Sequence, residues 1–383
     1  MSAVAEEVLL ARAYLMRVAE PPAPRLGHLV RLLGAVEAAE RLRSGVDLGP
    51  HVGAEVGSRR ELDRAADDLA AVRALGGRLV VPEDDDWPLA AMVGFDAAEG
   101  SGEWAAPLGL WVRGPVPLAG QVTAARRGVA MVGSRAATGY GKWVARDWAA
   151  SFADHGLAVV SGAALGIDGE AHRGCLAAGG TTVAVLACGV ERAYPAAHGR
   201  LLEEIAARGL VVSEYPVGAV PARHRFLVRN RIIAALATGT LLVEAGARSG
   251  AARTASAARA LGRPVLVVPG PVTSAMSVGN HVLARDGWST VVGSVAHVLA
   301  DLGPVGGDTG EAADGPPRPT TPFDGLSTAA VRVHGALRTH TPQGPGVLAR
   351  DSGVPPRAVD AALEELLAAG LVDGDGSRGW RAA

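Results

Sequence analysis

Between residues 128 and 268, short runs rich in valine and other strand-forming residues alternate with longer segments of helical periodicity. In one of these segments Val144, Trp148 and Phe152 recur every four residues, which places them on one face of a helix. Strands that alternate with helices pair in parallel. The pattern therefore predicts an α/β fold, a Rossmann-like, doubly wound parallel sheet. The predicted strands are Val129–Val132, Leu157–Val160, Thr182–Leu186, Leu210–Ser213, Thr240–Val243 and Pro264–Val268.

The sequence on either side of this region predicts smaller parts. Residues 1–80 carry helical patterns broken by glycines, which predicts a small N-terminal helical domain of the SAM or helix-hairpin-helix type. Residues 81–127 read as a linker that ends in an edge strand at 110–114. Residues 303–325, rich in Gly, Pro, Asp and Thr, predict a flexible linker before the last domain. Residues 326–383 predict three helices and a hairpin, the elements of a winged helix.

Composition excludes several classes of protein. No segment approaches the ~18 apolar residues of a membrane span, and the N-terminus lacks the pattern of a signal peptide. Cys175 and Cys188 are the only cysteines and have no companions at metal-ligand spacing, so we expect a reduced cytoplasmic protein without structural metal. The formal net charge of −2 does not by itself indicate a nucleic-acid partner, so the distribution of charge decides.

The turn after the first predicted strand has the composition of an anion site. Gly133 lets the backbone approach a ligand closely, with Ser134 beside it, and Arg135 offers a forked donor for phosphate oxygens. Thr138 could cap a helix whose N-terminal amides face a phosphate. The spacing is neither the dinucleotide fingerprint nor a P-loop, so neither nicotinamide nor ATP is favoured and no cofactor is expected. The alternative is a plain tight turn.

The turn after the next strand contains Gly162 and Asp168. Ligands of open α/β sheets collect at the carboxyl ends of strands, which makes Gly162 a candidate contact. Asp168 begins a helix, and capping of that helix is its simpler role.

Residues 223–233 form a basic patch, with four arginines and a histidine among residues 223–231 and no acid. Phe226 lies within it, and an exposed phenyl ring between cations suits base stacking. On a helix that begins near Phe226 we expect Leu227, Ile232 and Ile233 to face the core and the arginines to face outward. The alternative is a solvated helix face with Phe226 buried.

Several motifs occur in the order found in one bacterial family. They include G-S-R-x-A-T-x-Y-G at 133–141, S-G-x-A-x-G-I-D-x-x-A-H at 161–172, A-V-L-x-C-G-x-x-x-x-Y-P at 184–195, S-E-Y-P at 213–216, R-N-R-I-I at 229–233 and V-P-G at 268–270. Together they resemble the DNA-processing protein A (Smf) family over the whole α/β region. Many members of that family have Arg where Leu165 stands and Pro where Leu227 stands. The absence of that Arg removes one cation from the pocket, so DNA affinity is expected to be weaker than is usual in the family.

The resemblance implies a cytoplasmic homodimer that binds single-stranded DNA and passes it to the recombinase RecA, as in natural transformation. Combined with the turns and the basic patch, it yields one set of expected DNA contacts: Gly133, Ser134, Arg135, Gly162, Arg223, His224, Phe226, Arg229, Asn230 and Arg231.

In the predicted winged helix, the third helix sets Arg357 against Asp360, Glu364 and Glu365. This balance disfavours contact with phosphates, so we expect the tail to mediate protein contacts or to modulate the sheet domain. The same balance of charge argues against one alternative function, that of a transcription factor which recognises duplex DNA through the winged helix.

The main alternative is an enzyme, a nucleotide-processing hydrolase of the lysine-decarboxylase-like phosphoribohydrolase type. Residues 237–240 followed by Glu244 faintly resemble the site of those enzymes. Glu244 lies in an apolar run, however, where closing a buried polar network is its simpler role. His172 and His198 have no nucleophile motif nearby, so packing is the simpler role for both. We therefore expect a protein that is not an enzyme.

Overall fold

The structure, a computed structural model, describes residues 4–56, 59–98, 104–121, 128–247, 249–303 and 325–383. The chain divides into two units, residues 1–313 and 314–383, and each is described here by itself. The predicted flexible linker at 303–325 falls almost entirely outside the described residues. No described helix is both long enough and apolar enough to cross a membrane.

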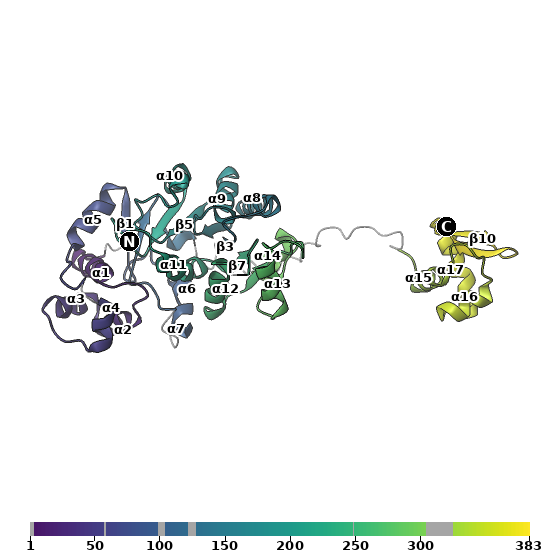
Figure 1. Ribbon diagram of the computed structural model, residues 1–383, viewed down its shortest axis with the longest axis horizontal. Helices are drawn as coiled ribbons and strands as arrows, with labels where there is room; N and C mark the ends of the chain where they lie inside the picture. The colour runs from purple at the N-terminus through teal and green to yellow at the C-terminus, as the bar shows by residue number, and fades with distance from the viewer. Residues whose placement is uncertain (1–3, 57–58, 99–103, 122–127, 248, 304–324) are drawn as a thin grey trace. The chain divides into compact units, whose positions relative to one another are not determined.

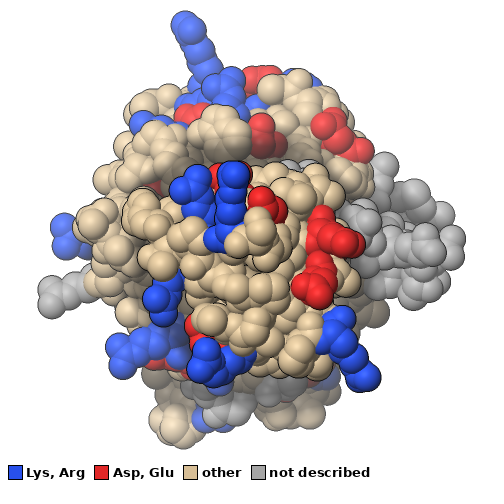
Figure 2. Space-filling view, turned by 90° about the vertical axis from the view of Figure 1, so that its right-hand side faces the viewer, with Lys and Arg blue, Asp and Glu red and all other residues tan. Residues whose placement is uncertain are grey.

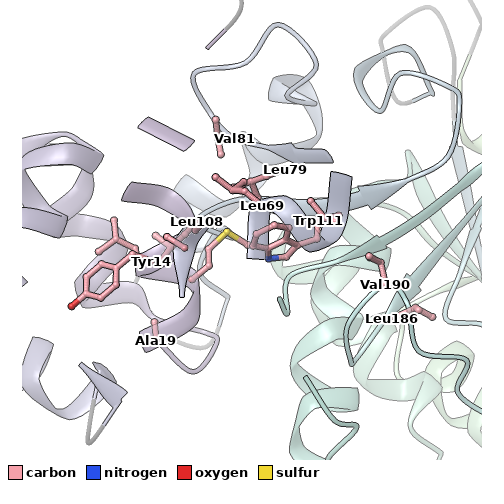
Figure 3. Close-up of a cluster of buried hydrophobic side chains, with 14 of the residues drawn as sticks. Tyr14, Ala19, Leu69, Leu79, Val81, Leu108, Trp111, Leu186 and Val190 are labelled. Carbon is pink, nitrogen blue, oxygen red and sulfur yellow. The ribbon is translucent and has the colours of Figure 1, made fainter. Parts of the chain in front are cut away.

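The chain begins with helices that pack against the sheet. Acidic Glu6 and Glu7 in the first turn of the first helix and Arg17 in its last complement the helix dipole. Figure 3 shows Tyr14 and Leu69 from this helical region in one cluster with Trp111 and Leu186 from the sheet. The N-terminal helices therefore share a core with the sheet. Their bounds are α1 Glu6–Val18, α2 Pro24–Leu33, α3 Ala35–Arg43, α4 Pro50–Val56 and α5 Ala65–Ala74.

The segment expected as a linker contributes to the sheet and its core. β1 (Gly77–Val80) and β2 (Leu110–Arg113) pair antiparallel with each other, and β2 also pairs antiparallel with β6 (Leu210–Ser213). The prediction that residues 110–114 form an edge strand is therefore wrong, because β1 takes the edge. Between the two strands lie the short helices α6 (Leu89–Met92) and α7 (Gly94–Ala98), and Phe95 is buried.

Nine strands in the described part of the chain form one sheet in the order β1-β2-β6-β5-β4-β3-β7-β8-β9. From β6 to β9 all neighbours are parallel, so the doubly wound sheet predicted from the sequence is confirmed. The chain winds outward in one direction from β3 and in the other from β7, which makes the β3–β7 boundary the switch point where such sheets bind ligands. The remaining strands are β3 Gly128–Val132, β4 Ala158–Ser161, β5 Thr182–Leu186, β7 Gly239–Leu242, β8 Val265–Val267 and β9 Thr290–Val291.

Helices cover both faces of the sheet (Figure 1). α8 (Gly139–Asp154), α9 (Ile167–Ala177) and α10 (Gly199–Arg208) lie on one face, whereas α11 (Arg223–Ala235) and α12 (Ala251–Ala260) lie on the other. The predicted apolar stripe of α8 is buried on the first face. α13 (Val278–Arg285) and α14 (Val295–Asp301) close the far end of the described sheet unit.

The C-terminal unit contains three helices and a hairpin around its own small core, which includes Val333, Leu348 and Leu363. Ser327 caps the first helix, and its hydroxyl also donates to Glu365 at 2.5 Å, so one of the acids of α17 is used inside the unit. These are the elements expected of a winged helix, and that assignment stays a prediction. The elements are α15 Thr328–Ala336, α16 Pro345–Ser352, α17 Pro356–Ala368, β10 Val372–Asp375 and β11 Gly379–Ala382.

Candidate nucleic-acid interface

A cleft of about 540 Å³ opens at the carboxyl ends of β3 and β7, at the switch point of the sheet. The turn after β3 forms one wall, α11 forms another, and the start of α12 closes a third. Of the residues predicted from the sequence, the cleft brings together Gly133, Ser134, Arg135, Phe226, Arg229 and Asn230. Ser249, Thr254 and Met276 also line it and were not predicted as site residues. Ser249 and Thr254 belong to a further motif shared with the family, S-G-x-x-x-T-A at 249–255, whereas Met276 is a single apolar residue without a pattern.

The turn after β3 is closely packed, and the side chain of Arg135 in this turn is exposed. A Cβ on Gly133 would lie 2.6 Å from Cγ1 of Ile167 and 2.7 Å from the carbonyl oxygen of Glu244, so only glycine fits. Ser134 donates its backbone N–H to the same carbonyl at 2.7 Å. Arg135 is exposed, and its guanidinium carbon lies 5.4 Å from the centre of the Phe226 ring. The turn therefore presents the exposed guanidinium of Arg135 beside the cleft.

Glu244 accounts for the rigidity of this turn. Its buried carboxylate accepts the backbone N–H of Thr138 at 2.9 Å and the Thr138 hydroxyl at 2.5 Å. Thr138 in turn caps α8, as expected, by accepting the N–H of Gly141 at 3.1 Å. The buried polar role predicted for Glu244 is confirmed. The carboxylate therefore occupies the place at the start of α8 where the sequence led us to expect a phosphate.

The second turn supports Arg229. Gly162 is buried, and a Cβ there would lie 2.5 Å from a guanidinium nitrogen of Arg229, so this glycine makes room for the arginine. Asp168 does not cap α9, whose N-cap is Gly166. Its carboxylate instead accepts the N–H groups of Gly162 at 3.1 Å and Ala164 at 3.4 Å. Burial raises the pKa of Asp168, against the opposing charge of Arg229.

The expectation that the arginines of 223–231 face outward is wrong for Arg229 and Arg231. Arg229 is 5% exposed and donates to the carbonyl oxygens of Gly162, at 2.9 Å, and Val185. Burial lowers its pKa to about 10, so it stays charged at neutral pH. Arg231 is 1% exposed and forms a two-pronged ion pair with Glu214, at 2.7 and 2.8 Å. Arg231 therefore supports the fold and does not reach the cleft.

Two residues in the first turn of α11 attach this helix to Glu20, which lies in the N-terminal part of the chain. His224 and Arg225 both contact the carboxylate of Glu20, at 2.9 and 2.8 Å, and Arg59 contacts it as well. Burial opposes ionisation of Glu20, but the hydrogen bonds from Arg225 and His224 outweigh it and hold its pKa below the usual range. His224 and Arg223 are both exposed, and of the two only His224 contacts Glu20 among the contacts described.

Two apolar positions on α11 differ from their expected roles. Leu227 is 45% exposed and lines the cleft, contrary to the prediction that it faces the core, whereas Ile232 and Ile233 are buried as predicted. Phe226 is half-buried, so it is neither the fully buried ring of the alternative reading nor freely exposed. Asn230 is buried and donates its side-chain N–H to the carbonyl of Gly250 at 3.2 Å.

The two histidines weighed as acid–base candidates are packed in the core. His172 pairs its Nδ1 with the Thr182 hydroxyl at 2.6 Å, and burial lowers its pKa to about 3. His198 is also buried, with its Nδ1 2.9 Å from the carbonyl oxygen of Ala163. Because His172 stays neutral near pH 7, it cannot exchange a proton there in the way that an acid–base catalyst must.

On the face of the molecule drawn in Figure 2, positively and negatively charged side chains are interspersed. This face therefore shows no concentration of a single sign of charge.

The fold and the cleft define a doubly wound α/β protein with a cleft, lined in part by Arg135, at its switch point. Comparison with known proteins is more specific. The profile of the DNA recombination-mediator protein A family matches residues 78–303. The putative DNA processing protein DprA of Mycobacterium tuberculosis is 48% identical over 374 residues, covering 96% of this chain and 93% of that protein. This chain belongs to the DNA recombination-mediator protein A family.

A second relative agrees with that assignment, both by its sequence and by its solved structure. DNA processing protein DprA of Streptococcus pneumoniae is 41% identical over 174 residues, which cover 45% of this chain and 61% of that protein. The X-ray structure of the S. pneumoniae protein superposes with a TM-score of 0.62 at 27% identity, covering 79% of this chain and 99% of that one.

Proposed function

We propose that this protein binds single-stranded DNA in the cleft at the switch point and delivers it to RecA, acting as a homodimer in the cytoplasm. The observation that carries the proposal is the exposed guanidinium of Arg135 beside the half-buried ring of Phe226. A cation and a ring at one site match the phosphates and the unstacked bases of a single strand. Membership of the recombination-mediator family supports delivery to a recombinase.

The expected DNA contacts divide into two groups on this reading. Gly133, Ser134, Arg135 and Phe226 form the contact surface, with Arg223 exposed at the start of α11. The second group supports the structure around the cleft and consists of Gly162, Arg229, Asn230 and Arg231. His224 contacts Glu20 and so helps to attach α11 to the N-terminal part of the chain.

Replacing Arg135 by alanine should weaken binding to an oligo-dT strand and lower the dependence of affinity on salt. A contact with one phosphate contributes about 0.7 to the slope of log affinity against log salt for single strands, so the slope should fall by about that amount. Fluorescence anisotropy across a salt series measures both quantities. Arg41→Ala removes the same charge from α3, outside the cleft, and should change neither. Equal slopes for wild type and Arg135→Ala would contradict the proposal.

Replacing Leu165 by arginine should strengthen the same binding. Leu165 is 45% exposed and follows Ala164, which lines the cleft, so an arginine there adds a cation without removing a core contact. We expect an affinity gain of several-fold at low salt that disappears at high salt, because the added attraction is electrostatic. A gain that persists at high salt, or no gain, would mean that this side of the cleft does not face the strand.

Delivery to RecA is tested by the lag before RecA hydrolyses ATP on single-stranded DNA covered by a single-strand-binding protein. The full chain should shorten the lag, and Arg135→Ala should shorten it less. Sedimentation equilibrium of the full chain tests the homodimer.

A further inference from the structure

Tyr194 forms an aromatic pair with Phe226, although the two rings come from different elements. Tyr194 lies in the turn that follows β5, and Phe226 lies in the first turn of α11. Their ring centres are 5.2 Å apart with an angle of 40° between the planes. Tyr194 is 39% exposed and does not line the cleft, so it extends the aromatic surface beyond the cleft wall.

The turn that carries Tyr194 is held firmly. Gly189 donates its N–H to the carbonyl of Ala219 at 3.1 Å, and the Glu191 carboxylate accepts the N–H of Gly218 at 3.0 Å. Arg192 closes the turn by donating its N–H to the carbonyl of Gly189 at 3.0 Å. A ring on a fixed support loses little entropy when a ligand stacks on it.

The surroundings of the pair are cationic. Arg135 lies over the Phe226 ring on the cleft side, and the side chain of Arg192 is exposed two residues before Tyr194. Tyr140 is a useful contrast, because that exposed tyrosine donates its hydroxyl to the carbonyl of Pro269 at 2.9 Å and so has a structural task. Two adjoining rings flanked by arginines form the pattern on which successive bases of a single strand stack.

We infer that Tyr194 is a second base-stacking position, which continues the path of single-stranded DNA from Phe226 out of the cleft and over the turn at 189–195. The inference rests on the proposed function, because it assigns a further contact to the same ligand. The strand then leaves the cleft beyond the carboxyl end of β5, over the turn that also carries the exposed Arg192.

Tyr194→Ala should weaken binding of the full chain to oligo-dT about 5- to 150-fold, the effect of losing one stacked base. Tyr194→Phe keeps the ring and should bind as wild type does. The salt slope should stay unchanged in Tyr194→Ala, because stacking releases no counterions. Trp143→Ala removes an exposed aromatic side chain from α8, outside the cleft, and should bind as wild type does.

An abasic strand of equal length separates stacking from an effect on the fold. It keeps the phosphates and lacks the bases, so wild type and Tyr194→Ala should bind it equally. Equal binding of oligo-dT by wild type and Tyr194→Ala would overturn the inference and leave the proposed function standing. A loss as large on the abasic strand would also overturn it, by showing that Tyr194 acts through the turn. Failure of wild type to bind oligo-dT would remove the proposed function itself.

Discussion

Replacing Arg231 by alanine should lower the free energy of unfolding by about 3–5 kcal/mol, the usual effect of removing one partner from a buried ion pair. Both nitrogens at the end of the Arg231 side chain bond to the Glu214 carboxylate, and its Nε donates to the carbonyl of Ala105 at 2.8 Å. Alanine leaves the Glu214 charge buried without a partner and creates a cavity. Urea denaturation followed by circular dichroism measures the loss.

Two companion variants separate this role from a contact with DNA. Arg231→Met combined with Glu214→Leu removes both charges and should recover most of the lost stability, because no unpaired charge remains. Arg223→Ala removes an exposed arginine from the same helix and should leave the free energy of unfolding within about 0.5 kcal/mol of wild type. An Arg231→Ala protein of normal stability that has lost DNA binding would restore the sequence-based assignment of Arg231 to the strand.

The sheet was predictable because its strands are marked locally. Each of the predicted runs from 129 to 268 is mostly apolar, which is typical of strands that are covered on both faces. The pattern therefore located all six, with bounds that differ from the structure by at most one residue at either end. β9 was missed because it has two residues, too few for any periodicity.

The edge of the sheet was not predictable in the same way. β1 follows a helix directly and precedes Asp84 and Asp86, residues typical of turns, so its surroundings resemble a linker. In the structure, these aspartates form hydrogen bonds that hold the segment in place. Asp86 pairs with Arg78 of β1 at 2.6 Å and accepts the N–H of Ala119 at 3.0 Å. Such long-range pairing fixes a polar segment in place without leaving any local pattern.

The site was predictable at the level of segments and not of side chains. The glycine-rich turn and the basic segment both border the cleft, as expected. Which arginine of 223–231 faces the cleft depends on partners elsewhere, such as Glu214 and the carbonyl of Val185. The same limitation hid Tyr194, whose neighbour Phe226 is distant in sequence.

Replacing Glu244 by alanine should lower the free energy of unfolding by about 2–4 kcal/mol, because it leaves the N–H and the hydroxyl of Thr138 without their acceptor. The effect should depend on Gly141, where a Cβ would lie 2.3 Å from the carboxylate. In wild type, Gly141→Ala therefore forces the carboxylate away and destabilises the protein. In Glu244→Ala, the same change fills empty space within α8 and should stabilise it by up to about 1 kcal/mol.

This reversal of sign in a double-mutant cycle identifies the carboxylate as the anchor of the turn, because only direct contact between the two positions produces it. The cycle also tests the hydrolase alternative, in which Glu244 would act on a nucleotide. A carboxylate held by two hydrogen bonds at the start of α8 is not available for that chemistry, so wild type should release no base from a nucleoside monophosphate. Turnover by wild type that Glu244→Gln abolishes, with additive effects in the cycle, would reverse the conclusion and make this cleft an active site.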